Sequence, residues 1–153
     1  MSKKILGIHE QETVQKMLDH ITSECNAVDV EKMYDEMLDE CSDSCAMCKQ
    51  FGASRILKEM DPTAYRCGLV DYTDSLCRDG RDSLIEIGDS YYKSRDVDNE
   101  KEAFISDLNT ELSELENDAG DLDAIDDEVE LEKLNDEIER RKSAIEACED
   151  HAW

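Results

Sequence analysis

The chain has 153 residues, of which 38% are charged and only 5% are aromatic, so its apolar residues suit thin helical packing better than a deep catalytic core. Its formal net charge is −24, from 41 acidic and 17 basic residues, which argues against nucleic acid or anionic membrane as a partner and favours basic surfaces. No segment approaches the roughly 20 apolar residues of a membrane span, and the N-terminal residues lack the apolar core of a signal peptide.

The charge is concentrated at the two ends of the chain. Residues 1–48 contain 11 acids and 4 bases, residues 49–97 contain 9 and 8, and residues 98–153 contain 21 and 5. The three net charges are therefore −7, −1 and −16. This distribution predicts a helical core over residues 1–97 and an acidic helical hairpin over residues 98–153.

The first part predicts two helices separated by a turn at residues 26–29. Apolar residues recur at helical spacing on both sides of this turn. The first apolar face consists of Val14, Met17, Leu18 and Ile21, and the second of Val30, Tyr34, Met37, Leu38 and Cys41. Each helix can bury only a narrow stripe, so we expect both to pack against the middle of the chain.

Three of the seven cysteines continue the second of these faces, at Cys41, Cys45 and Cys48. On one continuous helix this spacing places the three thiols on one side, and Cys67 or Cys77 could complete the four ligands of a zinc site. The alternative is that the three cysteines extend the apolar face as small core residues. The odd number of cysteines favours a reducing compartment over a disulfide framework. No cofactor is expected apart from this possible structural zinc ion.

The middle of the chain predicts two further helices. A short one is expected over residues 53–60. A longer one begins at Asp61 and Pro62, because Asp accepts hydrogen bonds from unpaired helical amides and Pro suits the first helical position, and it ends at Gly80. Its inward face is expected to consist of Tyr65, Leu69, Tyr72 and Leu76.

Residues 84–93 predict a β-hairpin, the one sheet expected in the chain. Two β-prone segments flank the dipeptide Gly88-Asp89, which is typical of a two-residue hairpin loop. We expect Tyr91 and Tyr92 to be exposed there and to contact a partner. Further candidates for such specific contacts are Arg55, Lys58 and Arg66.

The C-terminal part contains two apolar stripes with alternating three- and four-residue spacing. The first consists of Ile105, Leu108, Leu112, Leu115, Ala119 and Leu122, and the second of Leu131, Leu134, Ile138, Arg141, Ile145 and Cys148. The stripes are out of phase and Gly120 lies between them, which predicts an antiparallel coiled-coil hairpin instead of one continuous helix. The predicted fold is therefore mostly α with one short β-hairpin.

Acidic residues dominate this predicted hairpin, because residues 102–132 contain 13 acids and no Lys or Arg. Four of them share one helix side, about 100° from the apolar stripe. The predicted partner-binding acids are Asp107, Glu111, Glu114, Asp118, Asp121, Asp123, Asp126, Asp127 and Glu128. Like charges at this spacing destabilise a helix, so a functional role is one explanation. The alternative is a solvated surface that keeps the protein soluble.

The middle of the chain also carries a sequence pattern, DPxAYRxGxxDYxDSL, followed by the tyrosine hairpin. The pattern is formed by Asp61, Pro62, Ala64, Tyr65, Arg66, Gly68, Asp71, Tyr72, Asp74, Ser75 and Leu76. Over residues 30–97 the chain resembles a family of small phage and prophage proteins of unknown function. The resemblance implies a phage product that acts in the cytoplasm of the host cell, and it implies no catalytic residues.

Small acidic phage proteins resemble, in composition, inhibitors of host nucleic-acid enzymes such as anti-CRISPR and antirestriction proteins. Each predicted arm of about 20 residues is roughly 30 Å long, and duplex DNA of that length carries about 18 phosphates. The 21 acids of residues 98–153 are comparable in linear density. We therefore expect a non-enzymatic DNA mimic that binds a basic host protein, such as a CRISPR effector or another defence nuclease, and blocks its nucleic-acid site.

The alternative is a structural or assembly protein that forms a homodimer through its C-terminal coiled coil, because an apolar seam serves self-association as well as internal packing. A zinc-dependent DNA-binding regulator is a third interpretation, and the strongly negative charge argues against it. In the first two interpretations the chain does not bind nucleic acid directly, and in none of the three does it enter a membrane.

Overall fold

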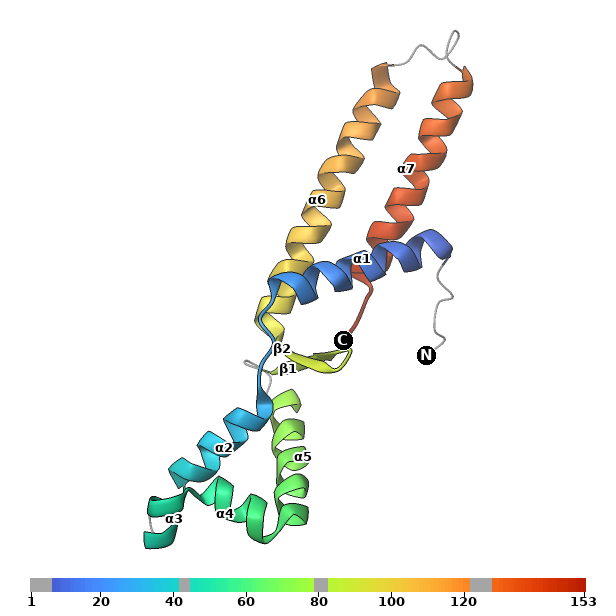
Figure 1. The fold of residues 1–153 in the computed structure, drawn as a ribbon. Helices are drawn as coiled ribbons and strands as arrows, with labels where there is room; N and C mark the ends of the chain where they lie inside the picture. The colour runs from blue at the N-terminus through green and yellow to red at the C-terminus, as the bar shows by residue number, and fades with distance from the viewer. Residues whose placement is uncertain (1–6, 42–44, 79–82, 122–127) are drawn as a thin grey trace. The chain divides into compact units, whose positions relative to one another are not determined.

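The computed structural model describes residues 7–41, 45–78, 83–121 and 128–153, and its fold is shown in Figure 1. The predicted fold class, mostly α with one short β-hairpin, is confirmed. In chain order the elements are α1 (Ile8–Glu24), α2 (Val30–Cys41), α3 (Ala46–Phe51), α4 (Ala53–Met60), α5 (Pro62–Arg78), β1 (Leu84–Ile87), β2 (Ser90–Lys93), α6 (Ser94–Asp121) and α7 (Glu128–Glu149).

The chain forms two compact units. One contains Met1–Asn26 and Asp96–Trp153, and the other contains Ala27–Arg95. This division differs from the boundary predicted at residue 97, since α1 lies in the same unit as the C-terminal helices.

In the Ala27–Arg95 unit, α2, α4 and α5 pack against one another. The start of α5 follows the sequence signal, because the Asp61 carboxylate accepts a 3.0 Å hydrogen bond from the Ala64 amide. The start of α4 is capped from a distance. Asp39 of α2 accepts hydrogen bonds from the amide of Ser54 at 2.8 Å and from its hydroxyl at 3.1 Å. Such a cap between helices leaves no local sequence signature.

An aromatic cluster joins α2 to α5. The ring of Tyr34 lies 5.3 Å from that of Tyr65 and 5.4 Å from that of Tyr72, measured between centroids. Tyr34 and Tyr65 are buried, whereas Tyr72 is half-buried. The predicted inward face of α5 is therefore the face that packs on α2.

The predicted hairpin forms at residues 84–93, with β1 and β2 antiparallel and Leu84 opposite Lys93. Gly88 occupies the loop with φ of +64°, a left-handed conformation that favours glycine. The amide of Val28 donates a 2.7 Å hydrogen bond to the Tyr91 carbonyl, which joins the segment before α2 to the edge of the hairpin.

The other unit is built on the α6–α7 hairpin, in which the two predicted apolar stripes meet. Leu112, Ile138 and Ile145 are buried in one cluster. The half-buried residues that pack against this cluster are Ile105, Leu108, Leu115 and Ala119. Leu122 lies outside the described residues. Burying these seam residues holds α6 and α7 together, because each large apolar side chain contributes about 1.5–3 kcal/mol when fully removed from water.

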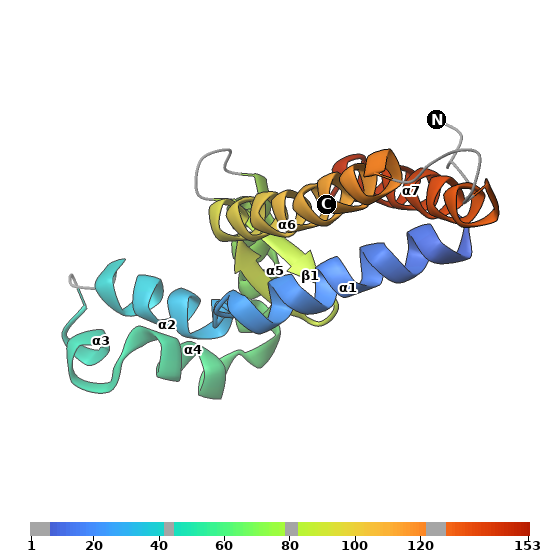
Figure 2. The same ribbon diagram turned by 90° about the horizontal axis from the view of Figure 1, so that it is seen from above.

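Helix α1 packs on α7 and crosses the α6–α7 pair on one of its sides (Figures 1 and 2). Its predicted apolar face is buried there through Val14, Met17 and Ile21. The expectation that both N-terminal helices pack on the middle of the chain is thus confirmed for α2 and wrong for α1. Periodicity identifies the buried face of a helix but not the surface that covers it.

Hydrogen bonds at the base of the α6–α7 hairpin also connect its two helices. Lys101 of α6 donates hydrogen bonds to the carbonyls of Glu149, at 3.1 Å, and His151, at 2.8 Å. These carbonyls lie at the C-terminal end of α7, where a cation is favoured by the helix dipole. Burial, together with the nearby Lys101 charge, lowers the pKa of His151.

Candidate partner-binding surface

The predicted acidic row lies on an exposed side of α6. Asp107, Glu111, Glu114 and Asp118 are all exposed, and the apolar side of the same helix is turned into the hairpin. In the described part of the chain, Asp107, Glu114 and Asp118 have no ion pair or side-chain hydrogen bond. A helix of 28 residues is about 42 Å long, so these carboxylates belong to an extended negative surface.

Glu111 differs from its neighbours because it pairs with Arg141 of α7. Arg141 also contacts Glu137, with 3.3 Å between Nε and Oε1. Partial burial acts to lower the pKa of Arg141, but the hydrogen bonds to the two glutamates outweigh it and raise that pKa. The sequence placed Arg141 in the apolar seam, and its position there is explained by this bridge between the helices.

A second bridge joins the helices through Lys142, whose Nζ lies 2.9 Å from the Glu116 carboxylate. This hydrogen bond raises the pKa of Lys142. The two bridges neutralise Glu111 and Glu116, whereas Asp107, Glu114 and Asp118 have no ion pair within the described ranges. Exposed ion pairs contribute only about 0–1 kcal/mol each to stability, so their main effect is to fix which acids remain available.

Two of the remaining predicted acids lie at the ends of the hairpin helices. Asp121 is the last residue of α6, Glu128 is the first residue of α7, and both are exposed. Asp123, Asp126 and Asp127 lie outside the described residues. The first turn of α7 is acidic, as the dipole at a helix N-terminus favours.

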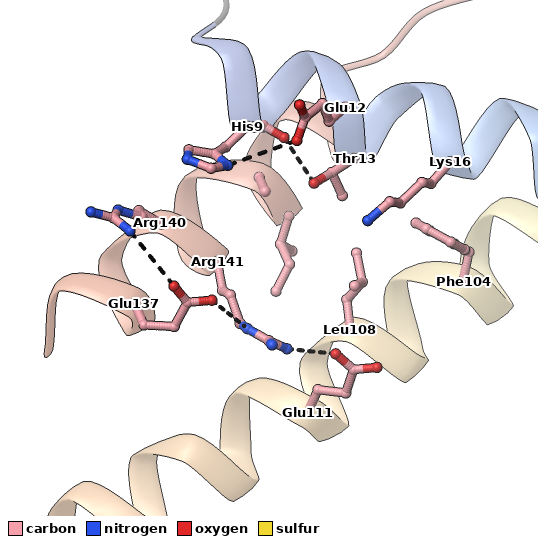
Figure 3. Close-up of a pocket in the computed structure, with 12 residues that line it drawn as sticks. His9, Glu12, Thr13, Lys16, Phe104, Leu108, Glu111, Glu137, Arg140 and Arg141 are labelled. Carbon is pink, nitrogen blue, oxygen red and sulfur yellow. Dashed lines mark hydrogen bonds and ion pairs between the residues drawn. The ribbon is translucent and has the colours of Figure 1, made fainter. Parts of the chain in front are cut away.

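A pocket of about 240 Å³ lies where α1, α6 and α7 meet. Figure 3 shows Lys16 pointing into it near Phe104 and Leu108, while Arg141 extends between Glu111 and Glu137. Among the residues that the structure describes, Lys16 has no ion pair. The pocket thus combines an apolar floor with charges of both signs, and it borders the acidic row at Glu111.

Tyr91 and Tyr92 of the β-hairpin were expected to be exposed, and the structure corrects this expectation for Tyr92. Its side chain is buried, and Tyr91 is half-buried. Burial, the largest cause, and nearby acids such as Glu86 raise the pKa of Tyr91. Strand alternation alone does not reveal that both tyrosines of this strand are at least partly covered.

The basic candidates in the middle of the chain are also mostly engaged. Arg55 pairs with Glu59 at 2.9 Å, and Lys58 lies 2.9 Å from Glu31 and 2.7 Å from Asp35. Arg66 is exposed. Of the proposed specific contacts, Arg66 is therefore the one that is most available.

The cysteines expected to bind zinc do not share a helix face. Helix α2 ends at Cys41, and Cys45 is the N-cap residue of α3, the separate short helix that contains Cys48. Cys67 is exposed on α5. Over the described ranges, no three His, Cys, Asp or Glu side chains are arranged to hold a metal ion. The alternative prediction, that these cysteines are small core residues, does not fit either, because Cys41 and Cys45 are exposed.

Comparison with known proteins adds no relative. No family model matches the chain, no curated protein matches it, and no solved structure matches it. The resemblance to small phage proteins therefore stays a prediction. None of the helices in the described part of the chain combines the length and hydropathy that a bilayer span requires.

Proposed function

We propose that this protein is a non-catalytic inhibitor whose acidic α6 surface binds a basic nucleic-acid-binding surface on another protein and blocks it. The observation that carries the proposal is the row of exposed carboxylates on α6, of which Asp107, Glu114 and Asp118 have no partner in the described chain. The expected target is a host defence nuclease, such as a CRISPR effector, as the sequence resemblance suggests.

Repulsion among the acidic residues of α6 destabilises this helix, which supports a role for these residues other than stabilising the fold. Like charges three or four residues apart each cost a helix about 0.2–0.5 kcal/mol, and the row contains three such neighbouring pairs. The bridge from Arg141 to Glu111 offsets only part of this repulsion. A basic groove that accepts a phosphate backbone would neutralise the unpaired acids and release the anions bound there.

The charge of the whole chain suits such an encounter. A net charge of −24 attracts a basic cleft over long range and accelerates association, while it repels nucleic acid and other copies of the same chain. Steering of this kind is screened by salt, with a Debye length of about 8 Å at physiological ionic strength. Inhibition should therefore weaken as salt rises.

Self-association through the helical seam receives less support. The central seam residues Leu112, Ile138 and Ile145 are buried within the hairpin of a single chain. Leu131 and Leu134, nearer the tip, are half-buried. A dimer would have to use these outer residues or open the hairpin.

Competition for DNA tests the proposal. A fluorescein-labelled DNA duplex would be bound to each of several purified enzymes, namely guide-loaded CRISPR effectors and restriction nucleases. Displacement of the duplex by this protein would be followed by fluorescence anisotropy. We expect displacement from at least one enzyme, with a half-effective concentration that increases between 0.05 and 0.2 M salt, about tenfold if a few exposed ion pairs are lost.

Two matched variants separate the α6 row from overall charge. The row variant carries Asp107→Asn, Glu114→Gln and Asp118→Asn. The control carries Glu40→Gln, Asp71→Asn and Asp89→Asn, three exposed acids of the other unit. Each changes the net charge from −24 to −21. The row variant should compete about tenfold less well and should unfold no more easily. If both variants compete as the unmodified protein does, or no enzyme releases its DNA, the proposal is wrong.

A further inference from the structure

Two cysteines lie three residues apart at the start of α3. Cys45 is its N-cap residue, with φ of −105° and ψ of 122°, and its carbonyl accepts a 3.0 Å hydrogen bond from the Lys49 amide. Cys48 lies in the first turn of the same helix, three residues further along the chain, and its interaction with the Cys45 thiol raises the pKa of Cys48. Cys45 is exposed and Cys48 is half-buried, so a small reagent can reach the pair.

The spacing of the pair nearly matches that of a disulfide. Side chains three residues apart on a helix have Cβ atoms about 5–6 Å apart, whereas a disulfide needs about 3.5–4.5 Å. Because Cys45 has an extended backbone conformation outside the helix, a small change there can close the gap. The bond would retain some strain, and strained, exposed disulfides are the ones that are easily reduced.

The other cysteines have different surroundings. Cys148 is buried, and burial raises its pKa, which makes it inert towards disulfides in solution. Cys67 and Cys77 are exposed on α5 but are ten residues apart in sequence, roughly 15 Å along a helix. They are too far apart to be bridged, and they provide internal controls.

We propose that Cys45 and Cys48 form a reversible intramolecular disulfide by exchange with a small-molecule disulfide such as glutathione disulfide. The Cys45 thiolate attacks one sulfur of the reagent and releases one glutathione thiolate, which leaves a mixed disulfide. The Cys48 thiolate then attacks the Cys45 sulfur and releases the second glutathione. The two protein thiols lose two electrons and two protons, and glutathione disulfide is reduced to two glutathiones.

The bond would change the geometry where α3 begins, and α3 packs against α4. The chain turns between these helices at Gly52, whose amide donates a 2.8 Å hydrogen bond to the Cys48 carbonyl. Oxidation would therefore act on the corner formed by α3 and α4. This inference is independent of the acidic surface on α6.

Equilibration of the whole protein in glutathione buffers tests the proposal. Samples at graded ratios of reduced to oxidised glutathione would be quenched with acid, alkylated, digested with trypsin and analysed by mass spectrometry. The cysteines at 41, 45 and 48 share one tryptic peptide, residues 33–49. We expect this peptide to lose two hydrogens in oxidising buffer and to regain them in reducing buffer, while Cys67 and Cys77 are alkylated or carry glutathione singly.

Single substitutions identify the bonded pair. Cys41→Ser should leave the oxidised form unchanged, whereas Cys45→Ser and Cys48→Ser should each abolish it, with far-UV circular dichroism as the check on folding. Loss of the oxidised form in Cys41→Ser, or its survival in Cys45→Ser, would assign the bond to another pair. Peptide 33–49 that stays reduced in the most oxidising buffer, or thiols protected by one equivalent of tightly bound zinc, would overturn the proposal.

Discussion

Gly68 of α5 lies directly against the side chain of Tyr34 of α2. A Cβ atom built on Gly68 would lie 2.0 Å from the Tyr34 hydroxyl oxygen and 3.1 Å from Cζ. The glycine is thus required by the approach of α2 to α5, not by its own backbone conformation. This contact gives a physical reason for the glycine within the DPxAYRxGxxDYxDSL pattern.

Replacing Gly68 with Ala should destabilise the protein by about 1–3 kcal/mol, because the added methyl group forces Tyr34 out of its packed position. Urea unfolding measures the effect. Gly120→Ala is the matched control, since a Cβ there meets nothing within 4 Å and should raise stability by about 0.5–1 kcal/mol. In the Tyr34→Phe background, Gly68→Ala should cost less. An equal gain in stability from both alanines would contradict the packing explanation.

At the scale of elements, a hydrogen-bonded network joins α2, α4 and α5. The Tyr65 hydroxyl of α5 donates a 2.6 Å hydrogen bond to Asp35 of α2, and Lys58 of α4 donates a 2.7 Å bond to the same carboxylate. The Lys58 ammonium also lies 4.8 Å from the centre of the Tyr65 ring. One carboxylate therefore fixes the positions of two other helices.

The network changes the ionisation of its members in a consistent direction. Burial acts to raise the pKa of Asp35, but hydrogen bonds from Lys58 and Tyr65 outweigh it and lower that pKa. Burial and the hydrogen bond to Asp35 raise the pKa of Tyr65 to about 12. Hydrogen bonds to Asp35 and Glu31 raise the pKa of Lys58. The folded state thus favours an ionised Asp35 beside a neutral Tyr65.

These shifts predict how the stability from Tyr65 depends on pH. Its folded pKa is raised above the unfolded value of 10.0, so its contribution is complete below pH 10 and is lost as pH rises towards about 12. The difference in unfolding free energy between the unmodified protein and Tyr65→Phe should be constant from pH 7 to 9 and should shrink above pH 10. Urea unfolding at graded pH measures it, and a difference that persists unchanged to pH 12 would contradict the assignment.

For the whole molecule, the elements that the sequence predicted well carry local signals. The Asp61 cap and the Gly88-Asp89 loop were located correctly because their causes lie within a few residues of each other. The seam of α6 and α7 was also predictable, since it is long and strictly periodic. The periodic seam also identifies the apolar side of α6. The acids of the same segment could therefore be assigned from the sequence to another side of that helix.

Among the features that the sequence missed, α2 ends at Cys41 and α3 begins at Ala46, although the spacing of the cysteines fits one helix. The burial of Tyr92 and the packing of α1 on α7 depend on contacts between distant residues, because they are decided by the surface that each meets. Spacing fixes which side of an element is apolar, whereas the choice among several apolar surfaces depends on the packing of the whole chain.

The oligomeric state is the property of the whole molecule that separates the proposed function from an assembly role. We expect sedimentation equilibrium to give 17.5 kDa, the mass of one chain, at both 0.05 and 0.5 M salt. A net charge of −24 opposes association at low salt, and a higher salt concentration screens that repulsion without weakening apolar contacts. A dimer held by the helical seam should therefore become stronger as salt rises, and Leu134→Asp should abolish it. A mass that increases with both salt and protein concentration, and returns to 17.5 kDa in Leu134→Asp, would favour assembly over inhibition.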